Sequence, residues 1–237
     1  MVLKTADYKE SDKMLTLLCP EKGKMSALSR GSKKAGSILR AGTQPFTVAD
    51  FYLNKRADKY YVTHCDVVDS FYSLSKDVTS FAFASFVADI CLNVSVEGPS
   101  ERLFSLAVNS LYSAKKEGAD IYKLFLYFLI KITDILGYRP SLNFCAVCGG
   151  KGNTFFSAAS GGVVCEKCKG EIKDLVKISP EILTVICEVL STPPKHMEEI
   201  IIKEEVRAKL KLIFCNYLES ILDFTPKSMK FLLSIIK

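Results

Sequence analysis

Four cysteines in the second half of the sequence are the residues whose spacing is best suited to metal binding. They form two C-x2-C pairs, Cys145/Cys148 and Cys165/Cys168, with sixteen residues between the pairs. Two tight turns of this kind typically present four thiolates to one zinc ion. Because four thiolates complete a tetrahedron and leave no position for water or substrate, we predict one zinc ion with a structural role.

Small residues follow each cysteine pair, and a short β-hairpin is predicted between the pairs. Gly149-Gly150 and Lys169-Gly170 leave backbone amides free to turn toward sulfur. Phe155-Phe156 and residues 161–164 have the composition of two short strands joined by a turn. We therefore predict a zinc finger over residues 143–172; the alternative is four buried thiols that bind no metal.

The remaining cysteines and the histidines do not form a second metal motif. Five cysteines occur singly among apolar residues, and we expect them in the core: Cys19, Cys65, Cys91, Cys187 and Cys215. Neither His64 nor His196 lies in a ligand motif, so both are predicted to be surface or hydrogen-bonded residues.

Sequence patterns for catalysis are not recognisable either. Gly31 and Gly36 have the spacing of a phosphate-binding loop, but Ser37-Ile38 stands where that loop needs Lys followed by Ser or Thr. We find no cluster of acidic metal ligands, no nucleophile with its base, and no complete H-x-E…P-C-x-x-C signature of a zinc deaminase. The sequence therefore predicts a protein that is not an enzyme.

Positive charge is concentrated at the start of the sequence. Residues 1–60 contain 12 lysines and arginines against six acidic residues, whereas the rest contains 20 of each, so the first quarter holds the whole net charge of +6. Such a surface attracts polyanions, nucleic acid above all, with a solvated lysine-rich face as the alternative. Residues 30–40 place four cations among glycine and serine, so their backbone can approach phosphates closely.

The first seventy residues have the pattern of a small β-barrel. Strands are predicted over residues 2–8, 13–19, 24–28, 46–53 and 59–68, with turns at residues 20–23 and 54–58. Five short strands suit an OB-fold. Because neighbouring strand residues point to opposite faces, Phe51-Tyr52 and Tyr60-Tyr61 must each place one ring outside the barrel. Such a ring either stacks on a base or only pairs across the sheet.

After Ser70 the apolar residues recur with the period of helices. Helices are predicted from Leu74 to Leu92, from Ser100 to Gly118 and from Ile121 to Leu136. Ser179-Pro180 and Thr225-Pro226 place a capping residue before proline and predict two further helix starts. The predicted fold class is α+β: an N-terminal OB-fold β-barrel domain over residues 1–74, then an α-helical domain over residues 75–237 with the zinc finger inserted.

The sequence predicts a cytoplasmic protein that does not contact a membrane. The start of the chain has no apolar signal core. The most apolar stretch, residues 124–130, is flanked by Lys123 and Lys131 and is too short to span a membrane. Nine cysteines without a secretory signal fit a reducing compartment better than a disulfide framework.

Taken in order, several segments of the sequence resemble the RecO family of bacterial recombination and repair mediators. They are residues 8–12 with Gly23-Lys24, residues 30–37 with Gln44-Pro45-Phe46, residues 136–142 with 145–149, Phe156-Ser157 with residues 161–165, and Lys227-Ser228. The order and spacing of the segments are specific, and the resemblance spans nearly the whole chain.

The resemblance implies both a fold and a function. The fold is an OB-fold, a helical domain and an inserted zinc finger. The function is to bind single- and double-stranded DNA, to anneal complementary strands, and to load RecA together with RecR and the single-stranded-DNA-binding protein, whose C-terminal tail the family binds. The family's basic surface maps here onto Lys24, Arg30, Lys33, Lys34 and Arg40. The alternatives are a zinc-stapled protein-interaction module and an RNA-binding protein with no annealing role.

Overall fold

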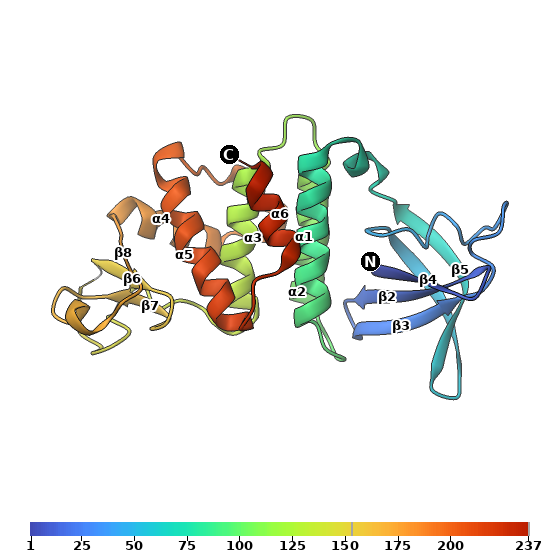
Figure 1. Cartoon of the computed structure of the whole chain (residues 1–237), viewed down its shortest axis with the longest axis horizontal. Coiled ribbons are helices and arrows are strands. Elements are labelled where there is room, and N and C mark those ends of the chain that lie inside the picture. Colours follow the sequence, from blue (N-terminus) through green and yellow to red (C-terminus); the bar gives the residue numbers. More distant parts are fainter. Residues whose placement is uncertain (153, 237) are drawn as a thin grey trace. The chain divides into compact units, whose positions relative to one another are not determined.

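A computed structural model describes residues 1–152 and 154–236, which form two compact units (Figure 1). The barrel unit consists of Met1–Ala119 and Ser228–Ile236, and the finger unit of Asp120–Lys227. Within the described residues, no helix is both long enough and apolar enough to cross a membrane.

The barrel unit begins with a five-stranded sheet. In order across the sheet, its strands are β1 (Val2–Tyr8), β2 (Asp12–Cys19), β3 (Gly23–Ser29), β5 (Lys59–Asp69) and β4 (Val48–Arg56). Neighbouring strands are antiparallel except β3 and β5, which pair in parallel through Ala27 with Tyr60 and Leu28 with Tyr61. The five predicted strands are confirmed.

Backbone hydrogen bonds close the sheet into a barrel. The amide of Val2 donates to the carbonyl of Thr47 at 2.8 Å, and the amide of Phe46 donates to the carbonyl of Val2 at 2.9 Å. The buried interior is formed by Val2, Leu15, Leu17, Ala27, Leu39, Val62 and Cys65. A five-stranded sheet of this order, closed around an apolar interior, has the architecture of an OB-fold.

The hairpin of β4 and β5 has a tighter turn than the sequence predicts. Arg56 pairs directly with Lys59, so only Ala57 and Asp58 form the turn, and the predicted loop over residues 54–58 is wrong. Ala57 has a φ of 49°, a left-handed conformation that such turns usually obtain from glycine or asparagine. Figure 1 shows this hairpin extending beyond the rest of the sheet.

Helices complete the barrel unit. They are η1 (Tyr72–Lys76), α1 (Val78–Val94), α2 (Glu101–Ala114) and, after its first residue, α6 (Lys227–Ile235). The carboxylate of Asp77 caps α1 by accepting from the amide of Ser80, so the helix begins later than the predicted Leu74, which lies in η1. Met229 and Leu232 of α6 are fully buried.

The finger unit contains three long helices, α3 (Ile121–Ile135), α4 (Pro180–Ser191) and α5 (Glu204–Leu222), and the short helix η3 (Pro194–Glu199) lies between α4 and α5. The hydroxyl of Ser179 accepts from the amide of Ile182, with Pro180 at the first helical position, as the sequence predicts. Nearly every residue of α3 is buried, which explains its almost uniformly apolar sequence.

A second, three-stranded sheet lies in the finger unit. Its central strand β6 (Phe155–Ser157) pairs with β7 (Gly162–Val164) on one side and β8 (Leu175–Lys177) on the other. The β6–β7 hairpin confirms the prediction, whereas β8 was not predicted. Between β7 and β8 the chain forms a short helix, η2 (Lys169–Glu171).

Candidate metal centre and nucleic-acid surface

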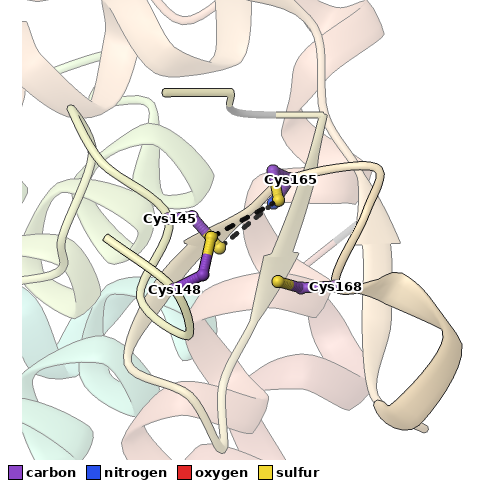
Figure 2. Close-up of side chains that lie close together, drawn as sticks. All are labelled: Cys145, Cys148, Cys165 and Cys168. Carbon is purple, nitrogen blue, oxygen red and sulfur yellow. Dashed lines mark hydrogen bonds between the residues drawn. The ribbon is translucent and has the colours of Figure 1, made fainter. Parts of the chain in front are cut away.

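The two cysteine pairs meet at one point beside the small sheet. All four Sγ atoms of Cys145, Cys148, Cys165 and Cys168 lie within 4.8 Å of one another. Figure 2 shows the four side chains converging, with Cys145 and Cys148 on one loop and Cys165 and Cys168 on another. The structure thus brings together the four residues that the sequence singles out as metal ligands.

Local backbone geometry fixes the first pair. The amide of Cys145 donates to the carbonyl of Gly150 at 2.8 Å, and the amide of Gly149 donates to the carbonyl of Cys145 at 2.8 Å. Gly149 has a φ of 70°, which glycine adopts without strain, so this tight turn requires it. The amide of Ala146 donates to the carbonyl of Val163 at 2.8 Å, which ties the turn to β7.

Regular structure positions the second pair. Cys165 directly follows β7, and Cys168 directly precedes η2. The amide of Cys165 donates to the sulfur of Cys145 at 3.4 Å across the cluster. Behind the sulfur atoms, Cys145, Val164 and Cys165 form a small buried cluster against Phe155, Ile172 and Leu175. This apolar backing shields one side of the centre from water.

The environment of Cys145 favours a thiolate. Hydrogen bonds from the backbone amides of Cys148 and Cys165 lower the pKa of the Cys145 thiol to about 6. A thiolate is the form that binds a metal, so this ligand is prepared for coordination near neutral pH.

The cluster fits a zinc ion in the chemistry of its ligands and, for one pair of sulfur atoms, in their spacing. Four ligands at about 2.3 Å from a tetrahedral zinc ion have sulfur atoms roughly 3.8 Å apart. The sulfur atoms of Cys148 and Cys165 are 3.8 Å apart. An ion bound here would supply cross-linking rather than chemistry, because the four thiolates complete its coordination.

The other cysteines follow the prediction in three cases of five. Cys65, Cys91 and Cys215 are buried, whereas Cys19 is only partly buried and Cys187 is exposed. Cys187 lies on α4 between Ile186 and Val189 in sequence but on the face away from those buried residues, so the core assignment is wrong for it. Because most residues of α4 are apolar, the sequence did not indicate which face of the helix is buried.

His64 is exposed and His196 is half-buried, and both are hydrogen-bonded to neighbouring carboxylates, as predicted. His64 Nε2 lies 3.0 Å from an oxygen of Asp66, and His196 Nδ1 lies 2.7 Å from an oxygen of Glu199. Neither histidine belongs to a metal-ligand cluster among the described residues.

The five cations that the sequence assigns to a nucleic-acid surface all lie on the barrel unit but in different environments. Arg30, Lys34 and Arg40 are exposed. Lys33 is exposed too, but its ammonium donates to the carboxylate of Asp7 at 2.8 Å. Lys24 is half-buried, and its ammonium donates to the carbonyl of Leu92 at the end of α1, 3.1 Å away.

The loop that carries most of these cations is anchored at its start. The amide of Gly31 donates to the carboxylate of Asp12 at 2.8 Å, and the amide of Lys33 donates to the carbonyl of Ser11 at 3.0 Å. The Gly31 hydrogen bond, opposed by partial burial, lowers the pKa of Asp12. The loop therefore presents its cations from a fixed base.

The aromatic pairs divide between the two faces of the sheet. Phe51 and Tyr60 pack against the barrel interior. Their neighbours point outward: Tyr52 is exposed, and Tyr61 carries the guanidinium of Arg30 over its ring, with 4.9 Å from Arg30 Cζ to the ring centroid. The structure thus decides which ring of each pair lies outside.

Comparison with known proteins identifies the family. Residues 1–71 match the family model described as "Recombination protein O N terminal", and residues 75–230 match "Recombination protein O C terminal". The chain belongs to the RecO family.

Relatives of this RecO-family chain align over almost its full length. Proteins named "DNA repair protein RecO" are 32% identical over 235 residues in Pelotomaculum thermopropionicum, 31% over 234 residues in Caldicellulosiruptor bescii and 29% over 234 residues in Bacillus subtilis. Each alignment covers 98% of this chain and 91%, 95% and 91% of the respective relative. The two family models meet between residues 71 and 75.

Proposed function

We propose that this chain is a non-enzymatic DNA repair and recombination mediator that binds single- and double-stranded DNA and anneals complementary strands. The observation that carries the proposal is the exposed basic loop of residues 30–40, anchored on a barrel of OB-fold architecture. Cations that neutralise phosphates on two strands lower the repulsion between those strands, so annealing needs no catalytic group.

The resemblance extends the proposal to protein partners. In this view the chain assists RecA loading together with RecR and the C-terminal tail of the single-stranded-DNA-binding protein. The helices supply docking surface, and one zinc ion on Cys145, Cys148, Cys165 and Cys168 braces the finger unit. The proposed DNA contacts are Lys24, Arg30, Lys33, Lys34 and Arg40. Of these, Lys24 and Lys33 donate hydrogen bonds to other residues of the chain, whereas Arg30, Lys34 and Arg40 are exposed.

Replacing Lys33 and Lys34 by alanine tests the proposed contacts. Both side chains are expected to reach the sugar-phosphate backbone rather than bases, so binding should weaken alike for all sequences. The slope of log K against log salt should become shallower by roughly 0.7 for each lost contact on single strands. Fluorescence anisotropy with several unrelated oligonucleotides, each titrated at a series of salt concentrations, measures both quantities.

An unchanged slope would contradict a backbone role for this pair. A strand-annealing assay, with and without single-stranded-DNA-binding protein, then tests the mediator function itself. A folded, zinc-loaded preparation that binds no oligonucleotide even at low ionic strength would overturn the proposal and favour a zinc-stapled protein-interaction module.

A further inference from the structure

The tip of the β4–β5 hairpin carries a group of cations that lies outside the predicted surface. We call residues 54–59 the hairpin arm; all of them are exposed, and three are cations: Lys55, Arg56 and Lys59. Lys22, in the turn between β2 and β3, joins them, because both its ammonium and that of Lys55 lie over the ring of Tyr60, at 5.5 and 5.8 Å from the centroid.

The arrangement of these charges is unfavourable for the hairpin alone. Arg56 and Lys59 stand directly opposite each other across the strands, and like charges at such positions destabilise a hairpin. Within the described residues, no carboxylate forms an ion pair with Lys22, Lys55, Arg56 or Lys59. Their positive charge therefore remains available to an external anion.

Two tyrosines at the base of the arm hold cations on both of its faces. Tyr60 lies opposite Lys55 and supports Lys22 and Lys55 on one face. The next residue, Tyr61, points to the other face, where Arg56 and Lys59 also lie by the alternation of the strands. There Tyr61 supports Arg30, which links this face of the arm to the basic loop. Ring contacts of this kind orient a cation without neutralising it.

We propose that the hairpin arm is a second nucleic-acid contact, which holds the sugar-phosphate backbone of a single strand through Lys55, Arg56 and Lys59. Arg30, fixed on Tyr61, connects it to the loop of residues 30–40. The inference rests on the proposed DNA binding and extends it beyond the loop.

A triple variant of the arm tests the inference. With Lys55→Gln, Arg56→Gln and Lys59→Gln, the salt slope for a labelled single strand of mixed sequence should become shallower by about 2, the sum of three contacts. For equal affinities at about 1 M salt, this slope change corresponds to an affinity about fiftyfold lower near 0.15 M salt. The thermal unfolding midpoint should not fall, because the substitution removes the repulsion between Arg56 and Lys59. Anisotropy titrations and a thermal melt of the zinc-loaded full chain give these readouts.

A control variant removes the same charge elsewhere. Lys195→Gln, Lys209→Gln and Lys230→Gln change three exposed lysines outside the five-stranded sheet and should leave the slope as in the wild type. An arm variant that binds like this control would overturn the inference and leave the arm as a solvated basic surface.

The outcomes also separate the arm from the loop. If the Lys33/Lys34 variant binds more weakly and the arm variant does not, the arm proposal fails and the proposed function stands. If only the arm variant binds more weakly, the arm proposal stands and the loop assignment fails. A wild-type chain that binds no oligonucleotide would contradict both the arm proposal and the proposed function.

Discussion

At the scale of single residues, the finger unit contains a lysine in an unusual position. Lys131 on α3 is only 7% exposed, and its ammonium donates to the carbonyls of Val189 and Leu190 at 3.0 and 2.7 Å. These carbonyls belong to the last turn of α4, where the helix has no internal donors for them and its dipole attracts a cation. A charge buried in α3 therefore stabilises the end of another helix.

Replacing Lys131 by methionine should destabilise the chain by about 2 kcal/mol, because two buried carbonyls lose their donor while the apolar volume is kept. Urea unfolding of the zinc-loaded protein, followed by circular dichroism, measures the difference. Lys209→Met, at an exposed position, is the matched control and should change the free energy of unfolding by less than about 0.5 kcal/mol. Equal stabilities of the two variants would refute the capping role of Lys131.

The ion pair of Asp120 and Arg207 makes a pH-dependent contribution in the same unit. Partial burial raises the pKa of Asp120, but the hydrogen bonds from the Lys123 amide and the Arg207 guanidinium lower it more, so the net shift is downward. A carboxyl whose pKa is depressed by folding contributes stability above its unfolded pKa of about 3.9, and that stability is lost as pH falls through the folded pKa.

Asp120→Asn isolates this charge, because asparagine caps a helix as well as aspartate does. We expect a loss of about 1 kcal/mol at pH 7, modest because the pair is partly solvent-exposed. The difference between wild type and variant should stay constant from pH 7 to about pH 5 and shrink below about pH 4. Denaturant titrations across that range would contradict the assignment if the difference did not depend on pH.

At the scale of elements, the small sheet of the finger unit depends on the cysteine cluster. Its strands are three residues each, too short to be stable as isolated pairs. The cluster ties the turn of Cys145 and Cys148 to the end of β7. A metal ion bound by these four cysteines would therefore supply free energy that orders these strands.

Removal of the metal should unfold the finger and leave the barrel folded. A structural zinc site contributes on the order of 10 kcal/mol of apparent binding free energy, so Cys148→Ser or treatment with a strong chelator should expose the amides of β6 and β7 to hydrogen exchange. Strands β1 to β5 should keep their protection. Elemental analysis of the untagged wild type should give about one zinc per chain; absence of zinc, or protection of β6 without it, would refute the site.

Elements were predictable where local signals were strong. The strands of the barrel follow period two between turn residues, and α1, α2, α3 and α4 follow apolar stripes or caps. By contrast, β8 has only three residues and no alternation to mark it, and the turn at Ala57 lacks glycine. The start of α5 was not predicted because Lys203 precedes it without a capping side chain.

The residues of the candidate site also differ in how far the sequence could predict them. The spacing of the four cysteines was sufficient to select them, because their two turns are local in sequence. The neutralisation of Lys33 by Asp7 and the redirection of Lys24 to Leu92 were not predictable, because each contact joins segments that are far apart in sequence. The cations of the hairpin arm were missed for lack of a motif.

At the scale of the whole molecule, the barrel unit is assembled from two distant parts of the chain. Residues 228–236 belong to it, although the entire finger unit lies between them and Ala119. The hydroxyl of Ser228 donates to the carboxylate of Asp89 on α1, and Met229 and Leu232 are fully buried. The last helix is therefore part of the core of the unit that begins the chain.

Leu232→Ala should destabilise the barrel unit by about 3 kcal/mol, because it leaves a cavity in a fully buried position. Hydrogen exchange should show the loss in α1, while the zinc-bound finger keeps its protection. Phe231→Ala, at an exposed neighbour on α6, is the control and should have a much smaller effect. Loss of protection in the finger alone would contradict this division of the chain.

The discontinuous barrel unit has a consequence for biosynthesis. Residues 120–227 form a continuous segment, so this unit can fold on the ribosome without a distant part of the chain. The first 119 residues are translated earlier, but the buried side chains of α6 can pack against their helices only after α6 has been synthesised. During translation, we therefore expect the finger unit to complete its fold before the barrel unit, which still lacks α6 at that point.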